Sequence, residues 1–415
     1  MEHTIFHIDV NSAFLSWSAV DRLEKGETID LRTIPSVIGG DSAKRHGIVL
    51  AKSIPAKAYH ISTGEPLVHA LSKCRTLVVV PPDHSMYTKK SHALMDFLKN
   101  ICPDIEQVSI DECYMDFTPI AASYTSPVAA ATKIKDDIFK EFGFTVNIGI
   151  SNRKVLAKMA SDFKKPDLVH TLYVDEIEKK MWSLPVSSLY MCGKSSVEEL
   201  RKLEILTIGD LAQADPAILE LHLKSHGRLL WEYANGIDTS VVEPIRADVK
   251  GVGNSTTMPQ DVTDLKEIGN ILLLLSESVA NRLRSANQMA SMVSVEIKYS
   301  TFVKVSHQTT LAAPTSNANE IYRTAFSLFQ QIWDESPVRL LGIRTSKLTD
   351  QTMPVQMSLF ELKSQNDSAA SHTPFDVQKS ARLDKALDSI RQKYGSNAIT
   401  RASTMDISKK PRNLK

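Results

Sequence analysis

QVSIDECYMDF, residues 107–117, places two carboxylates, Asp111 and Glu112, side by side in a run that otherwise has the character of a β-strand. Adjacent acids repel each other, and a continuous strand would send their side chains to opposite faces. A hairpin removes the conflict, with strands over 105–110 and 113–117 and both acids in the tight turn between them. The stretch therefore predicts a β-hairpin with two carboxylates that converge on one point.

Two carboxylates at one point are tolerated when a divalent cation neutralises them, and magnesium prefers such hard oxygen ligands. Asp9 ends an apolar strand predicted over 4–10. If that strand lies beside the hairpin, three carboxylates would suit two metal ions ~3.5–4 Å apart. The alternative is a solvated turn at 111–112, with Asp9 as a helix cap for the segment that starts at Asn11. Pattern alone leaves both interpretations open.

A basic cluster lies in the helix predicted over 152–166, which Pro166 ends and which Ser151 or Asn152 could cap. A cationic helix after a glycine-containing strand suits phosphate groups, although a solvated basic face has the same pattern. Acids for metal and cations for phosphate in one unit point to phosphoryl or nucleotidyl transfer. The cluster consists of Arg153, Lys154, Lys158, Lys164 and Lys165, against the single acid Asp162.

The length and composition fit a multidomain globular chain. At 415 residues the chain predicts roughly three domains. A net charge of +1 neither demands nor excludes nucleic acid. The four cysteines form no C-x-x-C pair, there is no pattern of a signal peptide, and no apolar run could span a membrane, so we expect a cytoplasmic protein. Up to about residue 168, strands alternate with helices, which predicts an α+β sheet with helices on one face.

The remainder of the chain changes character twice. Residues 170–240 have mostly helical patterns, 241–254 look like a connector, and 255–350 combine β-rich segments with helices over 264–286 and 317–333. After 350 the chain is polar, which is typical of a linker. A last helix over 380–394 would place an apolar stripe on one face, made of Leu383, Leu387, Ile390 and Tyr394.

Several motifs together resemble those of the Y-family translesion DNA polymerases of the DinB/UmuC type, over roughly residues 1–350. They are FHIDVNSAF (6–14), SIDECYMDF (109–117), GISNRKVLAKMASDFKKPD (149–167), STTMPQDVTD (255–264) and VRLLGIRTSKL (338–348). The resemblance implies an α+β right-hand polymerase with a ferredoxin-like palm, small fingers, a helical thumb and a separate α/β little finger. The implied boundaries are 1–11 and 74–168 for the palm, 12–73 for the fingers, 169–240 for the thumb, 241–254 for a linker, 255–350 for the little finger and 351–415 for the tail.

The resemblance also implies roles for individual residues. Asp9, Asp111 and Glu112, with the backbone carbonyl of Val10, would bind two Mg²⁺ ions, for which Mn²⁺ could substitute. Phe14 would be the steric gate that excludes the ribose 2′-hydroxyl. Lys57, Lys158 and Lys165 would grip the triphosphate of the incoming nucleotide.

The chain departs from the DinB pattern at several positions. S-I-P-A-K at 53–57 replaces N-Y-x-A-R, so Lys57 takes the place of an arginine and cannot form its bidentate fork. Asn11 and Ala13 stand where an acid and an aromatic residue are usual. In the thumb, residues 188–211 resemble a helix-hairpin-helix whose turn, YMCGK, has Met191 in place of a glycine, which weakens the case for phosphate binding there.

The little finger is neutral, with 11 basic and 11 acidic residues over 241–350, so weak, salt-sensitive DNA binding and low processivity are expected. Phosphate contacts could still come from six basic side chains if these share a face: Arg282, Arg284, Lys298, Lys304, Arg344 and Lys347.

QMSLF at 356–360 resembles the bacterial sliding-clamp-binding peptide. Leu359 and Phe360 would enter a clamp pocket, while Gln356 and Ser358 complete the motif.

The sequence thus predicts a monomeric, low-fidelity translesion polymerase with mutator character that acts in DNA repair. Its expected partners are primer–template DNA, deoxynucleoside triphosphates and the sliding clamp, with no membrane. A non-catalytic, clamp-recruited DNA-binding protein on a polymerase scaffold is the alternative. A palm-type nucleotide cyclase could use similar acids but would need neither thumb, little finger nor clamp peptide.

Overall fold

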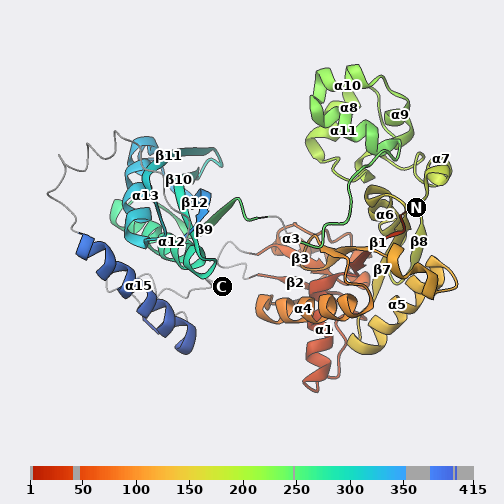
Figure 1. Cartoon of the computed structure of the whole chain (residues 1–415), viewed down its shortest axis with the longest axis horizontal. Helices are drawn as coiled ribbons and strands as arrows, with labels where there is room; N and C mark the ends of the chain where they lie inside the picture. Colours follow the sequence, from red (N-terminus) through yellow and green to blue (C-terminus); the bar gives the residue numbers. More distant parts are fainter. Residues whose placement is uncertain (1–2, 41–46, 246–247, 352–373, 396–397, 400–415) are drawn as a thin grey trace. The chain divides into compact units, whose positions relative to one another are not determined.

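The computed structural model describes residues 3–40, 47–245, 248–351, 374–395 and 398–399 (Figure 1). These residues form two compact units, one up to residue 245 and the other from residue 248 onward. Within the described ranges, no helix combines the length and the apolar character that crossing a bilayer requires. All four cysteines are buried and free.

The first unit is built on a five-stranded sheet of order β5-β6-β1-β7-β8. Strand β1 is central and antiparallel to both β6 and β7. With helices α4 and α5 as connections, the succession β1-α4-β5-β6-α5-β7 is the ferredoxin-like βαββαβ unit, which confirms the predicted palm topology. The strands are β1 (Ile5–Val10), β5 (Ile105–Gln107), β6 (Glu112–Asp116), β7 (Val146–Ser151) and β8 (Val169–Thr171).

The hairpin differs from its prediction in two respects. Strand β5 ends at Gln107 and not at residue 110. Asp111 lies in the turn, but Glu112 is the first residue of β6. The reason is that the backbone N–H groups of Val108 and Ser109 both donate to the carbonyl oxygen of Glu112, at 3.1 and 3.3 Å, so strand pairing already begins at this residue. The side chain of Asp111 therefore projects from a turn, and that of Glu112 projects from a strand.

Helices cover both faces of this sheet, not one face as expected. Helices α1 (Ala13–Glu24), α4 (His84–Ile101) and α5 (Pro127–Phe142) share a core with Phe6, Ile8 and Val10 of β1. Helix α6 (Lys154–Ser161) packs on the opposite face. It approaches β7 so closely that a Cβ atom on Gly149 would come within 2.0 Å of the Ala157 carbonyl oxygen. The glycine of the G-I-S motif therefore permits this contact.

Helix α6 is shorter than the predicted helix over 152–166. It ends at Ser161, and Arg153 is its N-cap residue without a side-chain cap, so neither Ser151 nor Asn152 caps it. The residues after Ser161 leave the helical path because the buried amide of Asn147 binds backbone groups on both sides of Lys165.

Two smaller modules complete the first unit. A three-stranded sheet of order β3-β2-β4 has its own core beside helices α2 and α3. Its elements are β2 (Ser36–Gly39), β3 (Val49–Lys52), β4 (Val78–Val80), α2 (Ile54–Lys57) and α3 (Leu67–Lys73). The predicted helical region packs against α6 in a common core and contains α7 (Ile177–Lys180), α8 (Lys194–Lys202), α9 (Ile208–Gln213), α10 (Pro216–Leu223) and α11 (Ser225–Ala234).

The second unit is an antiparallel sheet of order β11-β10-β12-β9 with α12 and α13 packed on one face (Figure 1). Strand β9 begins at Gly251, inside the segment 241–254 that was predicted to be a connector. The reason is the close packing of Gly251 against β12, where a Cβ atom on this residue would lie 2.6 Å from the Thr345 carbonyl oxygen. The elements are β9 (Gly251–Val262), α12 (Leu265–Ser285), β10 (Gln288–Tyr299), β11 (Lys304–Thr315), α13 (Ala318–Ile332), β12 (Val338–Asp350) and α15 (Pro374–Tyr394).

Only part of the apolar stripe predicted for helix α15 faces this unit, since Leu387 lines a small pocket with Glu277 and Arg284. Leu383 and Tyr394 of the stripe are 59% and 66% exposed, whereas Asp384 is only 7% exposed. The helix is held by polar pairs, chiefly from Asp388 to Arg284 and from Arg391 to Glu277.

Candidate active site

The face of the palm sheet under α6 brings together acids from distant parts of the chain. Asp9 of β1 lies directly opposite Glu112 of β6 in the antiparallel register, so both side chains project from the same face. The backbone N–H of Val10 donates to the carbonyl oxygen of Asp111 at 3.0 Å, which places the hairpin turn beside the end of β1. The predicted meeting of the first strand and the hairpin is therefore observed.

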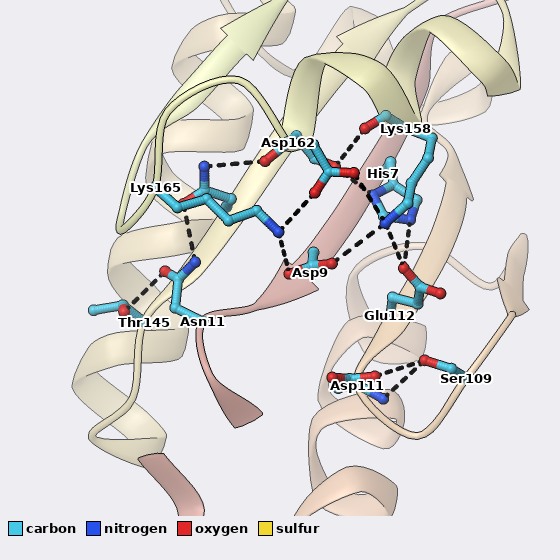
Figure 2. Close-up of polar contacts among 12 residues, drawn as sticks. His7, Asp9, Asn11, Ser109, Asp111, Glu112, Thr145, Lys158, Asp162 and Lys165 are labelled. Atoms are coloured by element: carbon cyan, nitrogen blue, oxygen red, sulfur yellow. Dashed lines mark hydrogen bonds and ion pairs between the residues drawn. The ribbon is translucent and has the colours of Figure 1, made fainter. Parts of the chain in front are cut away.

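Two lysines neutralise these acids (Figure 2). Lys158 of α6 places its Nζ 2.7 Å from Glu112 Oε2 and 3.4 Å from Asp9 Oδ2. Lys165 places its Nζ 2.7 Å from Asp9 Oδ1 and 2.8 Å from Asp162 Oδ1. Burial opposes the charge of Lys158, but the hydrogen bond to Glu112 and the surrounding carboxylates raise its pKa. Both predicted lysines thus carry full charge beside the acids.

The neighbouring acids Asp111 and Glu112 have pKa values shifted in opposite directions. Burial raises the pKa of Asp111, although its Oδ1 accepts a hydrogen bond from Ser109 Oγ at 2.6 Å. The contact with His7 and the ammonium group of Lys158 lower the pKa of Glu112 to about 2. Glu112 is consequently ionised at any physiological pH, while the ionised form of Asp111 is destabilised by its surroundings.

His7 is a site residue that the sequence analysis did not identify. It is 1% exposed, with Nδ1 2.8 Å from Ser161 Oγ and Nε2 3.4 Å from Glu112 Oε2. Burial lowers its pKa. Strand alternation from Asp9 would have placed His7 on the same face, which is the signal that could have revealed it.

A pocket of about 360 Å³ opens beside Asp9 and contains three of the other predicted site residues, Phe14, Lys57 and Asp111. Phe14 stacks on Tyr87 with ring centroids 4.5 Å apart and planes inclined by 10°, which fixes its ring. The pocket is lined by Asp9, Val10, Ser12, Ala13, Phe14, Leu50, Ala51, Lys52, Lys57, Thr63 and Asp111.

The segment S-I-P-A-K forms its own short helix on the wall of this pocket. Ser53 is the N-cap and accepts a hydrogen bond from the backbone N–H of Ala56 at 3.1 Å, and Lys57 ends the helix. Lys52, a residue that the sequence motifs did not single out, also lines the pocket. Burial lowers the pKa of Lys52, and the positive charge of Lys57 lowers it further. Two cationic side chains therefore face the pocket from this module.

The structure does not assemble every predicted feature. Among the described residues, no three His, Cys, Asp or Glu side chains are grouped closely enough to hold a metal ion, and the Asp111 carboxylate is bound to Ser109. The clamp-peptide residues Gln356, Ser358, Leu359 and Phe360 lie outside the described residues. In the thumb turn, Met191 has a φ of 69°, a conformation that glycine adopts without strain.

The six basic residues of the little finger do not all share a face. Lys298 and Lys304 are paired in the β10–β11 register, and Arg344 projects from the same side of the sheet four residue pairs along. Arg284 instead binds Asp388 of α15, and Arg282 donates to the carbonyl oxygen of Gly253.

Comparison with known proteins identifies relatives over the whole length. Residues 8–162 match the impB/mucB/samB family, and residues 249–359 match the C-terminal domain of that family. A DNA polymerase IV of Clostridium acetobutylicum is 47% identical over 99% of this chain and 100% of its own length. DNA polymerase IV of Alkaliphilus oremlandii is 36% identical over 97% of this chain and 99% of its own. A solved Y-family DNA polymerase chimera of Dbh and Dpo4 has a similar fold, with a TM-score of 0.72 at 21% identity, over 84% of this chain and 99% of the chimera.

Proposed function

The chain belongs to the impB/mucB/samB family as a Y-family polymerase of the DNA polymerase IV type, and we infer from this that it is a template-directed DNA polymerase that acts on damaged templates. The single observation that carries the inference is the 47% identity to a DNA polymerase IV over the full length of both chains. Nothing in the fold or in these relatives favours the non-catalytic alternative.

Asp9, Asp111, Glu112 and the carbonyl of Val10 are the proposed ligands of two Mg²⁺ ions, with Mn²⁺ as a substitute. Carboxylate and carbonyl oxygens are the donors that these hard cations prefer, so the donor set fits. The cluster also has room for positive charge, because the carboxylates of Asp9, Glu112 and Asp162 share two ammonium groups, while the nearby Asp111 carboxylate accepts from the Ser109 hydroxyl. Bound cations would lower the pKa of the primer 3′-hydroxyl and neutralise the triphosphate.

The lysines have two successive partners in this proposal. Without metal, Lys158 and Lys165 neutralise the acids. If the acids held cations, the ammonium groups of these lysines would be available to the phosphate oxygens of the incoming nucleotide, which are equally good acceptors for charge-assisted hydrogen bonds. Lys57, which lines the pocket beside Asp9 together with Lys52, is proposed to contact the same triphosphate.

Phe14 is the proposed steric gate. Its ring lines the pocket and is held by stacking on Tyr87, so it cannot turn aside without losing that contact. A ribose 2′-hydroxyl against this ring would lose its hydration without gaining a partner. The nucleotide sugar would therefore have to be deoxyribose.

The proposed partners follow from these assignments. Primer–template DNA would contact the open face of the little-finger sheet through Lys298, Lys304 and Arg344, and QMSLF would recruit a sliding clamp. Because few cations share that face, we expect weak DNA binding and low processivity without the clamp. The enzyme is proposed to work as a cytoplasmic monomer.

Primer extension with Mg²⁺ on undamaged and damaged templates tests the proposed function. The wild-type chain should extend the primer, and a double Asp111→Ala, Glu112→Ala variant should lose activity by at least about a thousandfold, because metal-held positioning and charge stabilisation supply most of the rate. Glu106→Ala, which changes an acid of the neighbouring strand β5, is the matched control and should retain activity. Equal, background-level extension by wild type and double variant would end the enzyme hypothesis.

A further inference from the structure

The loop that carries Lys165, residues 162–168, is attached to the palm sheet by a side-chain amide. Asn147 of β7 is fully buried, and its Nδ2 donates to the carbonyl oxygens of Lys164 and Ser161, at 2.7 and 3.2 Å. Its Oδ1 accepts from the backbone N–H of Leu168 at 3.3 Å. One amide therefore binds the backbone on both sides of Lys165.

A second amide extends the attachment to the strand that carries Asp9. Asn11, 7% exposed, accepts at Oδ1 from the backbone N–H of Asp167 at 2.9 Å and from Thr145 Oγ1 at 3.0 Å. Its Nδ2 donates to Asn147 Oδ1 at 3.1 Å. Asn11 thus links β1 to the loop two residues after Asp9, and Figure 2 shows it close to both Thr145 and the loop.

The chemistry of this network requires amides at both positions. An aspartate at position 11 would set a carboxylate oxygen against Asn147 Oδ1, now 3.1 Å from the Asn11 nitrogen. Rotation of the Asn147 amide would not help, because its oxygen would then face the carbonyl of Lys164. Buried polar atoms without partners are costly, so the pair is specific. This explains why the chain has asparagine where the family pattern has an acid.

The network determines where the ammonium group of Lys165 lies. Its side chain is 29% exposed and its Nζ contacts Asp9 and Asp162. Because Nζ stands at the end of a flexible side chain, its position depends on how well the loop backbone is held. The loop backbone is held by Asn11 and Asn147.

We propose that Asn11 and Asn147 are positioning residues that present Lys165 to the triphosphate of the incoming nucleotide. The inference rests on the proposed polymerase function. Neither amide touches the nucleotide in this proposal, and both act through Lys165.

A double-mutant cycle on nucleotide kinetics tests the proposal. Asn147→Ala and Lys165→Ala should each raise the KM for the deoxynucleoside triphosphate about tenfold, with a much smaller change in kcat for Asn147→Ala, because loss of buried hydrogen bonds loosens the loop. In the Lys165→Ala background, Asn147→Ala should change KM by less than about twofold. Multiplicative effects, or an unchanged KM in Asn147→Ala, would overturn the proposal.

Two further variants and a second measurement complete the experiment. Asn11→Ala removes the other half of the network and replaces Asn147→Ala if that variant does not fold. Ser151→Ala is the matched control, since it removes a buried hydrogen bond of the same strand β7, from Ser151 Oγ to the carbonyl oxygen of Leu172, which lies outside the loop. Amide hydrogen exchange over 162–168 should accelerate in the asparagine variants and not in the control. A wild type that cannot extend primers defeats the polymerase function itself, whereas an active wild type with unaffected asparagine variants defeats only this inference.

Discussion

Asp111 and Glu112 are adjacent in the chain but experience different surroundings. Glu112 starts a strand and faces His7 and Lys158, which favour its ionised form. Asp111 lies in the turn, where burial disfavours ionisation. Opposite pKa shifts in neighbouring acids are common at functional sites, and here they separate Glu112, whose charge Lys158 compensates, from Asp111, whose ionised form burial destabilises.

The opposite shifts predict opposite effects on stability without metal. The lowered pKa of Glu112 contributes stability above its ordinary value of 4.5, and this contribution is lost as pH falls toward 2. The raised pKa of Asp111 has a cost above its ordinary value of 3.8. At pH 7 in EDTA, Glu112→Gln should therefore lower the free energy of unfolding by roughly 1–3 kcal/mol, and Asp111→Asn should increase it.

Thermal melting from pH 3 to 8 measures these effects. The destabilisation caused by Glu112→Gln should shrink at the acid end, and added Mg²⁺ should raise the Tm of the wild type more than that of either variant. Shifts of the same sign in both variants at pH 7 would contradict the assignment.

The Phe14 ring makes a second prediction at the scale of one residue. Phe14→Ala should increase insertion of ribonucleotides relative to deoxyribonucleotides by at least about tenfold, because the space beneath the sugar opens. The ratio of the two kcat/KM values measures this selectivity. Trp17→Phe, a conservative change of a buried aromatic near Phe14, is the control for general disturbance of α1. Unchanged sugar selectivity in Phe14→Ala would rule out the gate.

Among the elements, α15 shows how charge pairs replace part of an apolar contact. Arg284 forks onto Asp388 with Nε at 2.6 Å and Nη2 at 3.0 Å, and its side chain is 14% exposed. Asn281 and Asn317 donate to the acids of the same helix face. Such a contact weakens as salt screens the charges, unlike a hydrophobic one. The helix is therefore attached in a way that ionic strength can modulate.

Arg284→Ala should detach α15. Breaking a partly buried charge pair leaves Asp388 without its main cation, so amide exchange within the helix should accelerate by at least about tenfold. Arg282→Ala is the matched control on the same helix, because Arg282 donates to Gly253 and not to α15. In the wild type, 1 M NaCl should reproduce part of the Arg284→Ala effect. Equal exchange in the two variants would show that other contacts hold the helix.

At the scale of the whole molecule, the DNA contact proposed for the little finger rests on few charges. The little finger is electrically balanced, and Arg284 is engaged by α15. Each phosphate contact contributes about one unit to the salt dependence of affinity. A polymerase with so few contacts should dissociate readily, and the proposed binding of QMSLF to a sliding clamp would counter this.

Replacing Leu359 and Phe360 by alanine should abolish stimulation by a bacterial sliding clamp and leave unassisted, distributive synthesis unchanged. The reason is that the two apolar side chains supply most of the buried contact of so short a peptide. Product length with and without clamp provides the measurement. Leu362→Ala, just outside the motif, is the control. Undiminished stimulation in the double variant would mean that QMSLF is a chance match.

Local patterns in the sequence are enough to predict many features of this structure. Alternation in β1 and β6 is enough to place Asp9 and Glu112 on one face, since side-chain direction in a strand depends only on position. Ser53 and Ser126 cap the helices that follow them through hydrogen bonds to backbone N–H groups three residues ahead, so these caps depend only on neighbouring residues. The order of the motifs likewise indicated the family and the ferredoxin-like palm.

The tertiary structure decided what depends on distant partners. It brought Asp111 into contact with Ser109, ended α6 at Ser161 and attached the Lys165 loop to the sheet through Asn11 and Asn147. It also gave α15 a charged contact face in place of part of its apolar stripe. The physical reason is common to all of them: burial and hydrogen-bond partners are properties of packing between remote segments, and no local period in a sequence records them.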